Sequence, residues 1–268
     1  MHVNGFVPEN DLANVPSFDK FAAKLSARAA ASAVEHIIPE YTPVSNQKGW
    51  AACTANASLD TAEALIGLRD PTKVVQLSRM AGWFLARRRE GTEHDNVGVK
   101  LSTMFSILQE VGACAEDLWP YDPPDGIDPD VWIQTQPKLA AFEVMSDNKL
   151  LGWSQIFELD DALLDAVDCS VYANHPVVYG TAIDAPFRDY DGSGIVLVPP
   201  ENPDDIIGRH AIAIFGRRLR QGRREYWIRN SWDKDWGMNG HVWVDQSYVT
   251  WSEAMNHTVG TYCADIIS

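Results

Sequence analysis

A cysteine, a histidine and an asparagine stand in three separate segments that together supply the groups of a nucleophilic hydrolase. Cys53 opens the Ala-rich run CTANASLDTAEAL, and Gln47 lies six residues before it. Far downstream, His210 stands in GRHAIAIFG and Asn230 in WIRNSWDKDWGMNGH. A thiol beside an imidazole base, which is itself oriented by an amide, can attack a carbonyl carbon and form a thioester. We therefore expect Cys53 as the nucleophile, His210 as the base and Asn230 as the orienting group.

These three segments resemble the papain family of cysteine peptidases, and its bacterial-type branch most closely. Residues 53–57 begin C-T-A-N-A, as the nucleophile helix of that branch often does. The run Asn230-Ser231-Trp232, followed by Trp236-Gly237 and Gly240, is very close to the family's N-S-W-G-x-x-W-G-x-x-G. The resemblance covers about residues 44–244. It implies an α+β, papain-like fold in which a helical lobe is followed by a β-barrel-like lobe, with the active-site cleft between them.

The resemblance also implies roles for individual residues. The side-chain N–H of Gln47 and the backbone N–H of Cys53 would donate to the oxyanion of the tetrahedral intermediate. Asn230 would fix the tautomer and angle of the His210 ring. The expected catalytic set is therefore Cys53, His210, Asn230 and Gln47.

Two further residues are expected at the substrate side of the site. Val97-Gly98 resembles the glycine-bearing strand that the family pairs with the substrate backbone, and a plain turn glycine is the alternative interpretation. Trp232 follows Asn230 directly and is expected to cover the bond between Asn230 and His210. Gly98 and Trp232 are thus the expected substrate-binding residues.

The ionisation of Cys53 can be predicted from its place at the start of a helix. An ordinary thiol has a pKa of about 8.5 and is mostly protonated at neutral pH. A helix N-terminus and a nearby imidazolium both favour the anion. The sequence therefore predicts a thiolate–imidazolium pair of Cys53 and His210.

The chain departs from the family pattern near the site. Trp50 stands where many members have a disulfide cysteine, which fits a reducing compartment. Ala51-Ala52 replaces a Gly-Ser pair, and Asp233 replaces the common glycine after N-S-W. His241 stands where an aromatic residue is usual, so we expect it to pack. Arg209, just before the base, is expected to point to solvent.

Composition and charge exclude several other classes. With 22 basic and 37 acidic residues, the net charge is −15, which disfavours nucleic-acid partners. No apolar stretch is long enough for a membrane span, and no basic-plus-apolar leader is visible at the start. The four cysteines lack zinc-ligand spacing, so we expect no metal, no cofactor and no disulfide. We expect a cytoplasmic protein with peptide or protein substrates; its oligomeric state stays open.

The pattern along the chain places helices first and strands later. Helices are predicted over 52–65, 77–89 and 100–110, and short β-rich runs such as HPVVYGTAI, GIVLVP, HAIAIFGRR, REYWIRN and HVWVD follow. The Pro- and Asp-rich run LWPYDPPDGIDPD marks a lobe boundary near 122–130. The expected organisation is an N-terminal helical extension over 1–40, a helical lobe over 41–125 and a β-rich lobe over 126–268.

Three alternatives stay open at this stage. The amphipathic helix expected over 17–36 either packs on the body or covers the cleft. The same catalytic groups can hydrolyse amides or transfer acyl groups as in transpeptidation or transglutamination. A catalytically silent binding protein of the same fold is the third possibility, although intact Cys53, His210, Asn230 and Gln47 argue against it.

Overall fold

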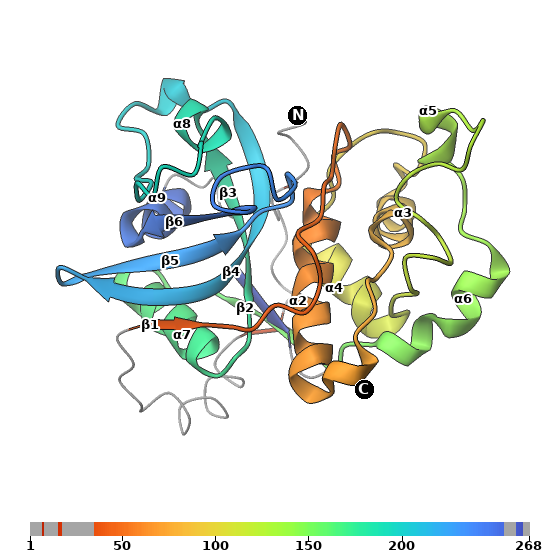
Figure 1. Cartoon of the computed structure of the whole chain (residues 1–268), viewed down its shortest axis with the longest axis horizontal. Coiled ribbons are helices and arrows are strands. Elements are labelled where there is room, and N and C mark those ends of the chain that lie inside the picture. The colour runs from red at the N-terminus through yellow and green to blue at the C-terminus, as the bar shows by residue number, and fades with distance from the viewer. Residues whose placement is uncertain (1–6, 8–15, 18–34, 255–260, 265–268) are drawn as a thin grey trace.

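The chain folds into a helical lobe and a sheet lobe that lie side by side (Figure 1). This computed structural model describes residues 7, 16–17, 35–254 and 261–264. Helix α2 (Cys53–Arg69) runs along the junction between the two lobes, and nearly all its side chains are buried. Because α2 packs on helices on one side and on the sheet on the other, it cannot have the single apolar stripe of a surface helix.

The helical lobe is built from segments whose ends are defined by local chemistry. The Ser78 hydroxyl accepts the Ala81 N–H at 3.0 Å and so caps α3, while Gly91 ends the same helix with φ of 74°. The three helices predicted over 52–65, 77–89 and 100–110 are confirmed, with one more turn at the end of the first. The lobe contains α2, α3 (Arg79–Glu90), α4 (Leu101–Glu110), α5 (Pro129–Trp132), α6 (Leu139–Met145), η1 (Pro71–Lys73) and η2 (Ser146–Asn148).

The helical side continues past the boundary expected at residue 125. Helices α5 and α6 lie beside α3 and α4 (Figure 1). The Ala113 N–H donates to the Met145 carbonyl at 3.1 Å, which ties the end of α6 to the turn after α4. The Pro- and Asp-rich run that suggested a boundary is therefore a loop within the helical lobe.

The sheet is antiparallel throughout and is strongly curved (Figure 1). A two-residue turn at Gln221-Gly222, both with positive φ, joins the strand Gly208–Arg220 to the strand Arg223–Arg229 as a tight hairpin. The order is β2-β7-β3-β4-β5-β6, with β1 paired to β4. The strands are β1 (Glu35–Ile37), β2 (Trp153–Ile156), β3 (Val177–Ile183), β4 (Gly208–Arg220), β5 (Arg223–Arg229), β6 (His241–Asp245) and β7 (Thr261–Ala264).

Several elements of this lobe differ from the sequence prediction. The run GIVLVP contributes only an isolated bridge between Leu197 and Val244, because it lies in the long connection between β3 and β4. The helices α7 and α9 and the strand β2 were not predicted. Beside the sheet lie α7 (Asp160–Tyr172), α8 (Ala185–Arg188), η3 (Pro203–Asp205) and α9 (Gln246–Ala254).

The helix predicted over 17–36 falls mostly outside the described residues. Its last two residues, Glu35 and His36, belong to β1 and pair with Arg218 and Arg217 of β4. Pairing with an available strand edge overrides the weak helix preference of this end of the segment. The prediction was therefore wrong for these two residues.

Candidate active site

The first turn of α2 places Cys53 against the strand that carries His210. Ala52 precedes the helix, and its methyl side chain supplies no capping oxygen to the first turn of α2. The Ala211 N–H of β4 donates to Cys53 Sγ at 3.3 Å. The thiol is fully buried. This contact joins two residues that are 158 positions apart and brings the expected nucleophile to the expected base.

Asn230 holds His210 in one tautomer. Asn230 Oδ1 lies 2.7 Å from His210 Nε2 and also accepts the Ser231 N–H at 2.8 Å. A carbonyl oxygen can only accept, so Nε2 must carry a proton. His210 Nδ1 has no hydrogen-bond partner among the described residues. In the neutral ring this nitrogen carries the lone pair, which makes it the basic atom.

Aromatic rings close off the bond between His210 and Asn230. The Trp232 ring stacks on the His210 ring with centroids 4.6 Å apart, and the Phe187 ring meets the same imidazole edge-on at 6.4 Å. Trp232 is itself only 5% exposed. Water is thereby kept from the hydrogen bond that fixes the tautomer, in keeping with the covering role expected for Trp232.

Gln47 is held rigidly beside this pair. Its Oε1 accepts the Ser231 hydroxyl at 2.7 Å, and its Nε2 donates to the Trp50 carbonyl at 3.0 Å. The Gln47 backbone N–H donates to the Ser231 carbonyl at 2.8 Å, and the Gln47 carbonyl accepts the Tyr121 hydroxyl at 2.9 Å. Since Ser231 engages its amide oxygen and Trp50 its amide nitrogen, the orientation of the Gln47 side chain is fixed.

The aspartate that replaces a family glycine keeps the backbone shape and adds a contact. Asp233 has φ of 72°, in the left-handed region that glycine usually fills and that aspartate tolerates better than most residues. Its Oδ2 accepts from Asn46 Nδ2 at 3.0 Å. Asn46 precedes Gln47, so this bond ties the oxyanion-side loop to the loop after Asn230. Sequence reasoning gave Asn46 no role.

The ion pair predicted for the resting site is not favoured in this arrangement. Burial raises the pKa of the Cys53 thiol to about 12. Hydrogen bonds from the Ala211 N–H and from Thr54 lower this pKa, but they offset only part of the effect of burial. Burial also lowers the pKa of His210 to about 4, although its bond to Asn230 opposes the shift. Desolvation penalises both charged forms, so the neutral thiol and neutral imidazole are favoured.

Gly98 lies in a buried segment next to the start of α2. The carbonyl of the following residue, Val99, accepts the Thr54 hydroxyl at 3.1 Å. The N–H of Val7 donates to the same carbonyl at 3.3 Å. A residue near the N-terminus of this chain therefore already uses a backbone acceptor beside the predicted substrate-pairing position.

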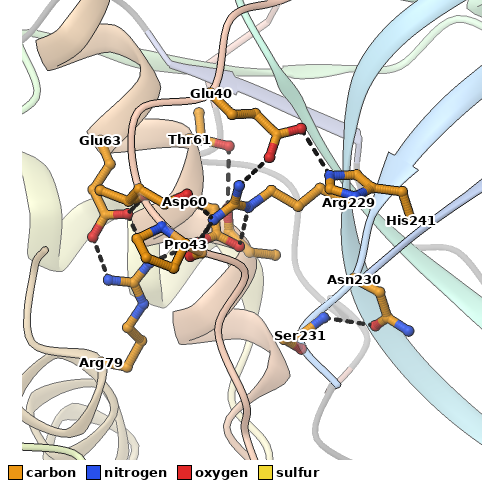
Figure 2. Close-up of polar contacts among 12 residues, drawn as sticks. Glu40, Pro43, Asp60, Thr61, Glu63, Arg79, Arg229, Asn230, Ser231 and His241 are labelled. Carbon is orange, nitrogen blue, oxygen red and sulfur yellow. Dashed lines mark hydrogen bonds and ion pairs between the residues drawn. The ribbon is translucent and has the colours of Figure 1, made fainter. Parts of the chain in front are cut away.

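A network of buried charges joins the two lobes (Figure 2). Arg79 of α3 donates to Asp60 Oδ1 at 2.6 Å and to Glu63 Oε2 at 2.8 Å, both on α2. Burial alone would lower the pKa of Arg79, but the charges of Glu63 and Asp60 raise it above its ordinary value. All three side chains are at most 2% exposed.

Arg229 extends this network to the residue next to Asn230. Its Nε lies 3.2 Å from Asp60 Oδ2, and its Nη2 donates to the Pro43 carbonyl at 2.6 Å (Figure 2). Nη1 pairs with Glu40, whose other oxygen lies 2.7 Å from His241 Nε2. His241 also stacks on the Trp227 ring at 5.0 Å, as expected of a packing residue. The network thus connects α2, the segment leading to Gln47 and the end of β5.

Sequence reasoning missed this network and most of the loop contacts. Asp60 and Glu63 stand in an otherwise Ala- and Leu-rich helix, and that contrast is the one signal that indicates buried charge. Arg209, in contrast, is exposed as expected. Among the described residues, no group of three or more His, Cys, Asp or Glu side chains is placed to hold a metal ion. In the same part of the chain, no helix is long and apolar enough to cross a bilayer.

The described cysteines carry free thiols. They are Cys53, Cys114 and Cys169. The side chain of Cys263 is outside the described part of the chain.

Comparison with known proteins places the chain in one family. Residues 32–260 match the model of the papain family cysteine proteases. An uncharacterized peptidase C1-like protein of Acanthamoeba polyphaga mimivirus is 24% identical over 219 residues, which are 79% of this chain and 67% of that protein. Cathepsin J of Rattus norvegicus is 25% identical over 75% of this chain and 56% of its own length. The chain thus spans between about half and two thirds of the curated relatives it matches.

A solved structure confirms the fold over the whole chain. Xylellain, a cysteine protease from Xylella fastidiosa, superposes with a TM-score of 0.82 at 19% identity, covering 100% of this chain and 97% of that one. This likeness shows the two-lobe, papain-like α+β fold that the sequence predicted. Together with the family match over most of the chain, it leads to one conclusion: the chain belongs to the papain family of cysteine proteases.

Proposed function

We propose that this chain hydrolyses peptide bonds through a thioester at Cys53. The observation that carries the proposal is the pairing of His210 Nε2 with Asn230 Oδ1. It leaves Nδ1 without a partner among the described residues, on the strand that contacts Cys53 Sγ. Membership of the cysteine protease family supplies the substrate class, peptides or proteins.

The acylation step needs one proton transfer to begin. The Cys53 thiol gives its proton to His210 Nδ1 as Sγ attacks the scissile carbonyl carbon. The carbonyl oxygen becomes an oxyanion, which the Cys53 backbone N–H and the Gln47 side-chain amide stabilise. Loss of one such donor typically costs about 2.7–4 kcal/mol of transition-state stabilisation.

Collapse of the intermediate releases the first product. The C–N bond breaks, and the imidazolium of His210 returns the proton to the leaving amine. Water, deprotonated by the same nitrogen, then attacks the thioester and releases the acid and the free thiol. Because burial disfavours the charged form of each group, the proposed proton transfer to His210 accompanies the attack of Sγ.

Cleavage of a peptide library tests this proposal. The wild-type chain should cleave at defined sequences, and the Cys53→Ala variant should cleave none of them. Matched melting curves for the two proteins would show that the loss is chemical. A wild-type chain that cleaves no peptide, or a Cys53→Ala variant that cleaves as well as wild type, would overturn the proposal.

A further inference from the structure

The segment that contains Gly98 is anchored to the helical lobe by two side chains of α3. Arg87 donates to the carbonyls of Glu93 and Asp95 at 3.1 and 2.7 Å. Trp83 Nε1 donates to the Val97 carbonyl at 3.1 Å. These contacts fix the position of residues 93–97 relative to α3, but they do not reach the loop that precedes Cys53.

Asn96 makes that second connection through both ends of its amide. Its Oδ1 accepts the Ala51 N–H at 2.8 Å, and its Nδ2 donates to the Gly49 carbonyl at 3.2 Å. Ala51 is fully buried and lies two residues before the nucleophile. One side chain thus satisfies a donor and an acceptor of the loop leading into α2, from 45 positions away.

A second hydrogen bond, on the other side of Gly98, also connects this segment to the residues around Cys53. Thr54, directly after Cys53, donates its hydroxyl to the Val99 carbonyl at 3.1 Å. Gly98 therefore lies between two attachment points, Asn96 and Val99, that both lead to the segment around Cys53. This arrangement sets the distance between the backbone expected to pair with substrate and the Cys53 N–H expected to meet the oxyanion.

We propose that Asn96 is a positioning residue that couples the substrate-pairing segment 97–99 to the oxyanion-side loop 49–53. The inference rests on the proposed function, because it assigns Asn96 an effect on peptide hydrolysis. Reacting groups must be held within a fraction of an ångström of productive geometry, and a misplacement of about 1 Å can reduce the rate about 100-fold. In this chain Trp50 excludes a disulfide at its position in this loop, and the amide of Asn96 supplies a non-covalent link instead.

The kinetic test compares three variants on two kinds of substrate. Asn96→Ala should lower kcat/KM for peptides of several residues by about 10- to 100-fold. It should lower kcat/KM less for a short ester that has no backbone to pair with residues 97–99. Asn96→Asp keeps an acceptor for the Ala51 N–H but loses the donor to Gly49, so it should fall between wild type and Asn96→Ala.

Asn148 provides the matched control. Its Nδ2 donates to the Ala113 carbonyl at 3.1 Å, a similar amide-to-backbone bond within the helical lobe. Asn148→Ala should leave kcat/KM unchanged for both the peptide and the short ester. Equal losses on the long and short substrates in Asn96→Ala, or losses as large in Asn148→Ala, would mean a general structural effect and would overturn the assignment.

Hydrogen exchange decides the structural half of the proposal whether or not any substrate is cleaved. The Ala51 amide should exchange at least about tenfold faster in Asn96→Ala than in wild type, because it loses its acceptor. In Asn148→Ala it should exchange at the wild-type rate. An unchanged Ala51 amide in Asn96→Ala would overturn the coupling, whereas failure of wild-type cleavage alone would overturn only the proposed function.

Discussion

Two groups of ionisable side chains lie almost completely buried within this molecule, and they respond to burial in opposite ways. In the described part of the chain no charge compensates Cys53 or His210, so desolvation favours their neutral forms. Arg79 and Arg229 are as deeply buried, yet the carboxylates of Asp60, Glu63 and Glu40 hold both pKa values above their ordinary range. Partners, rather than depth, decide which buried groups keep their charge.

The difference separates chemistry from architecture. The charged network connects α2, α3, β5 and the segment leading to Gln47, so its loss should affect the fold. The uncharged pair carries the groups proposed to react, so its loss should affect the reaction more than the fold. Replacing single residues in each region tests this division.

Replacing the nucleophile should produce the largest effect on activity and little on the fold. Cys53→Ala removes the group that forms the thioester, and losses of this kind reach about 10⁴-fold or more in turnover. The variant should melt within a few degrees of wild type, since alanine fits the space of the thiol. Turnover of a fluorogenic peptide and a thermal melt measure the two quantities. A large loss of stability would show that Cys53 is also needed for the fold.

Breaking the charged network should reverse that pattern. Arg79→Met leaves Glu63 without its cation and should cost about 3–5 kcal/mol of unfolding free energy, as is typical when one partner of a buried pair is removed. Urea unfolding measures the change. Lys234→Met is the control, because the pair of Lys234 with Asp235 is 73% and 80% exposed, and its loss should not shift the unfolding midpoint. Equal midpoints for the two variants would contradict the comparison.

Acid should destabilise the molecule through His210. Its pKa is about 4 in the folded chain and about 6.5 when unfolded, so only the unfolded state gains the proton between these values. Stability from this group is therefore complete above about pH 6.5 and is lost as pH falls towards 4, by about 3 kcal/mol in total.

The pH experiment compares wild type with His210→Gln. Unfolding free energies measured from pH 7 to 4.5 should decline more steeply in wild type, and the difference in slope isolates His210 from the titrating carboxylates. Parallel curves for wild type and His210→Gln would show that His210 is not held neutral.

Thiol labelling should show the smallest but most specific contrast. Iodoacetamide reacts with thiolate, so Cys53, with its raised pKa, should have no advantage over Cys114 or Cys169. A peptidyl epoxide, which binds in the cleft and is aligned with the thiol, should label Cys53 at least about tenfold faster than the others. Peptide mapping after brief treatment gives the ratios. Rapid labelling of Cys53 by iodoacetamide would instead indicate the preformed ion pair.

The candidate catalytic groups could be proposed from the sequence because each stands in a short motif. Cys53, His210 and Asn230 were identified from local runs, and the structure brings all three segments together. The three helices of the first lobe were predicted because periodicity and caps are local signals. The chemical roles of Cys53, His210 and Asn230 stay predictions until the variants are measured.

The charged network, the neutral state of Cys53 and His210, and the pairing of β1 could not be predicted, because they depend on contacts between distant residues. A charged residue on a helix is usually solvated, so Asp60 and Glu63 gave no reason to expect Arg79 and Arg229 beside them. The neutral state of the catalytic pair depends on burial, which no motif encodes. The edge pairing of Glu35 and His36 with β4 likewise required knowledge of which strand lay open.

The long separation between contacting residues has a consequence for the newly made chain. Gln47 and Ser231 are 184 positions apart, and Glu40 and Arg229 are 189 apart. Cys53 emerges from the ribosome long before His210 or Asn230 is added, so a half-synthesised chain holds the proposed nucleophile without its base. On the proposed mechanism, hydrolysis can therefore begin only after the segments carrying His210 and Asn230 have been made and have folded against Cys53.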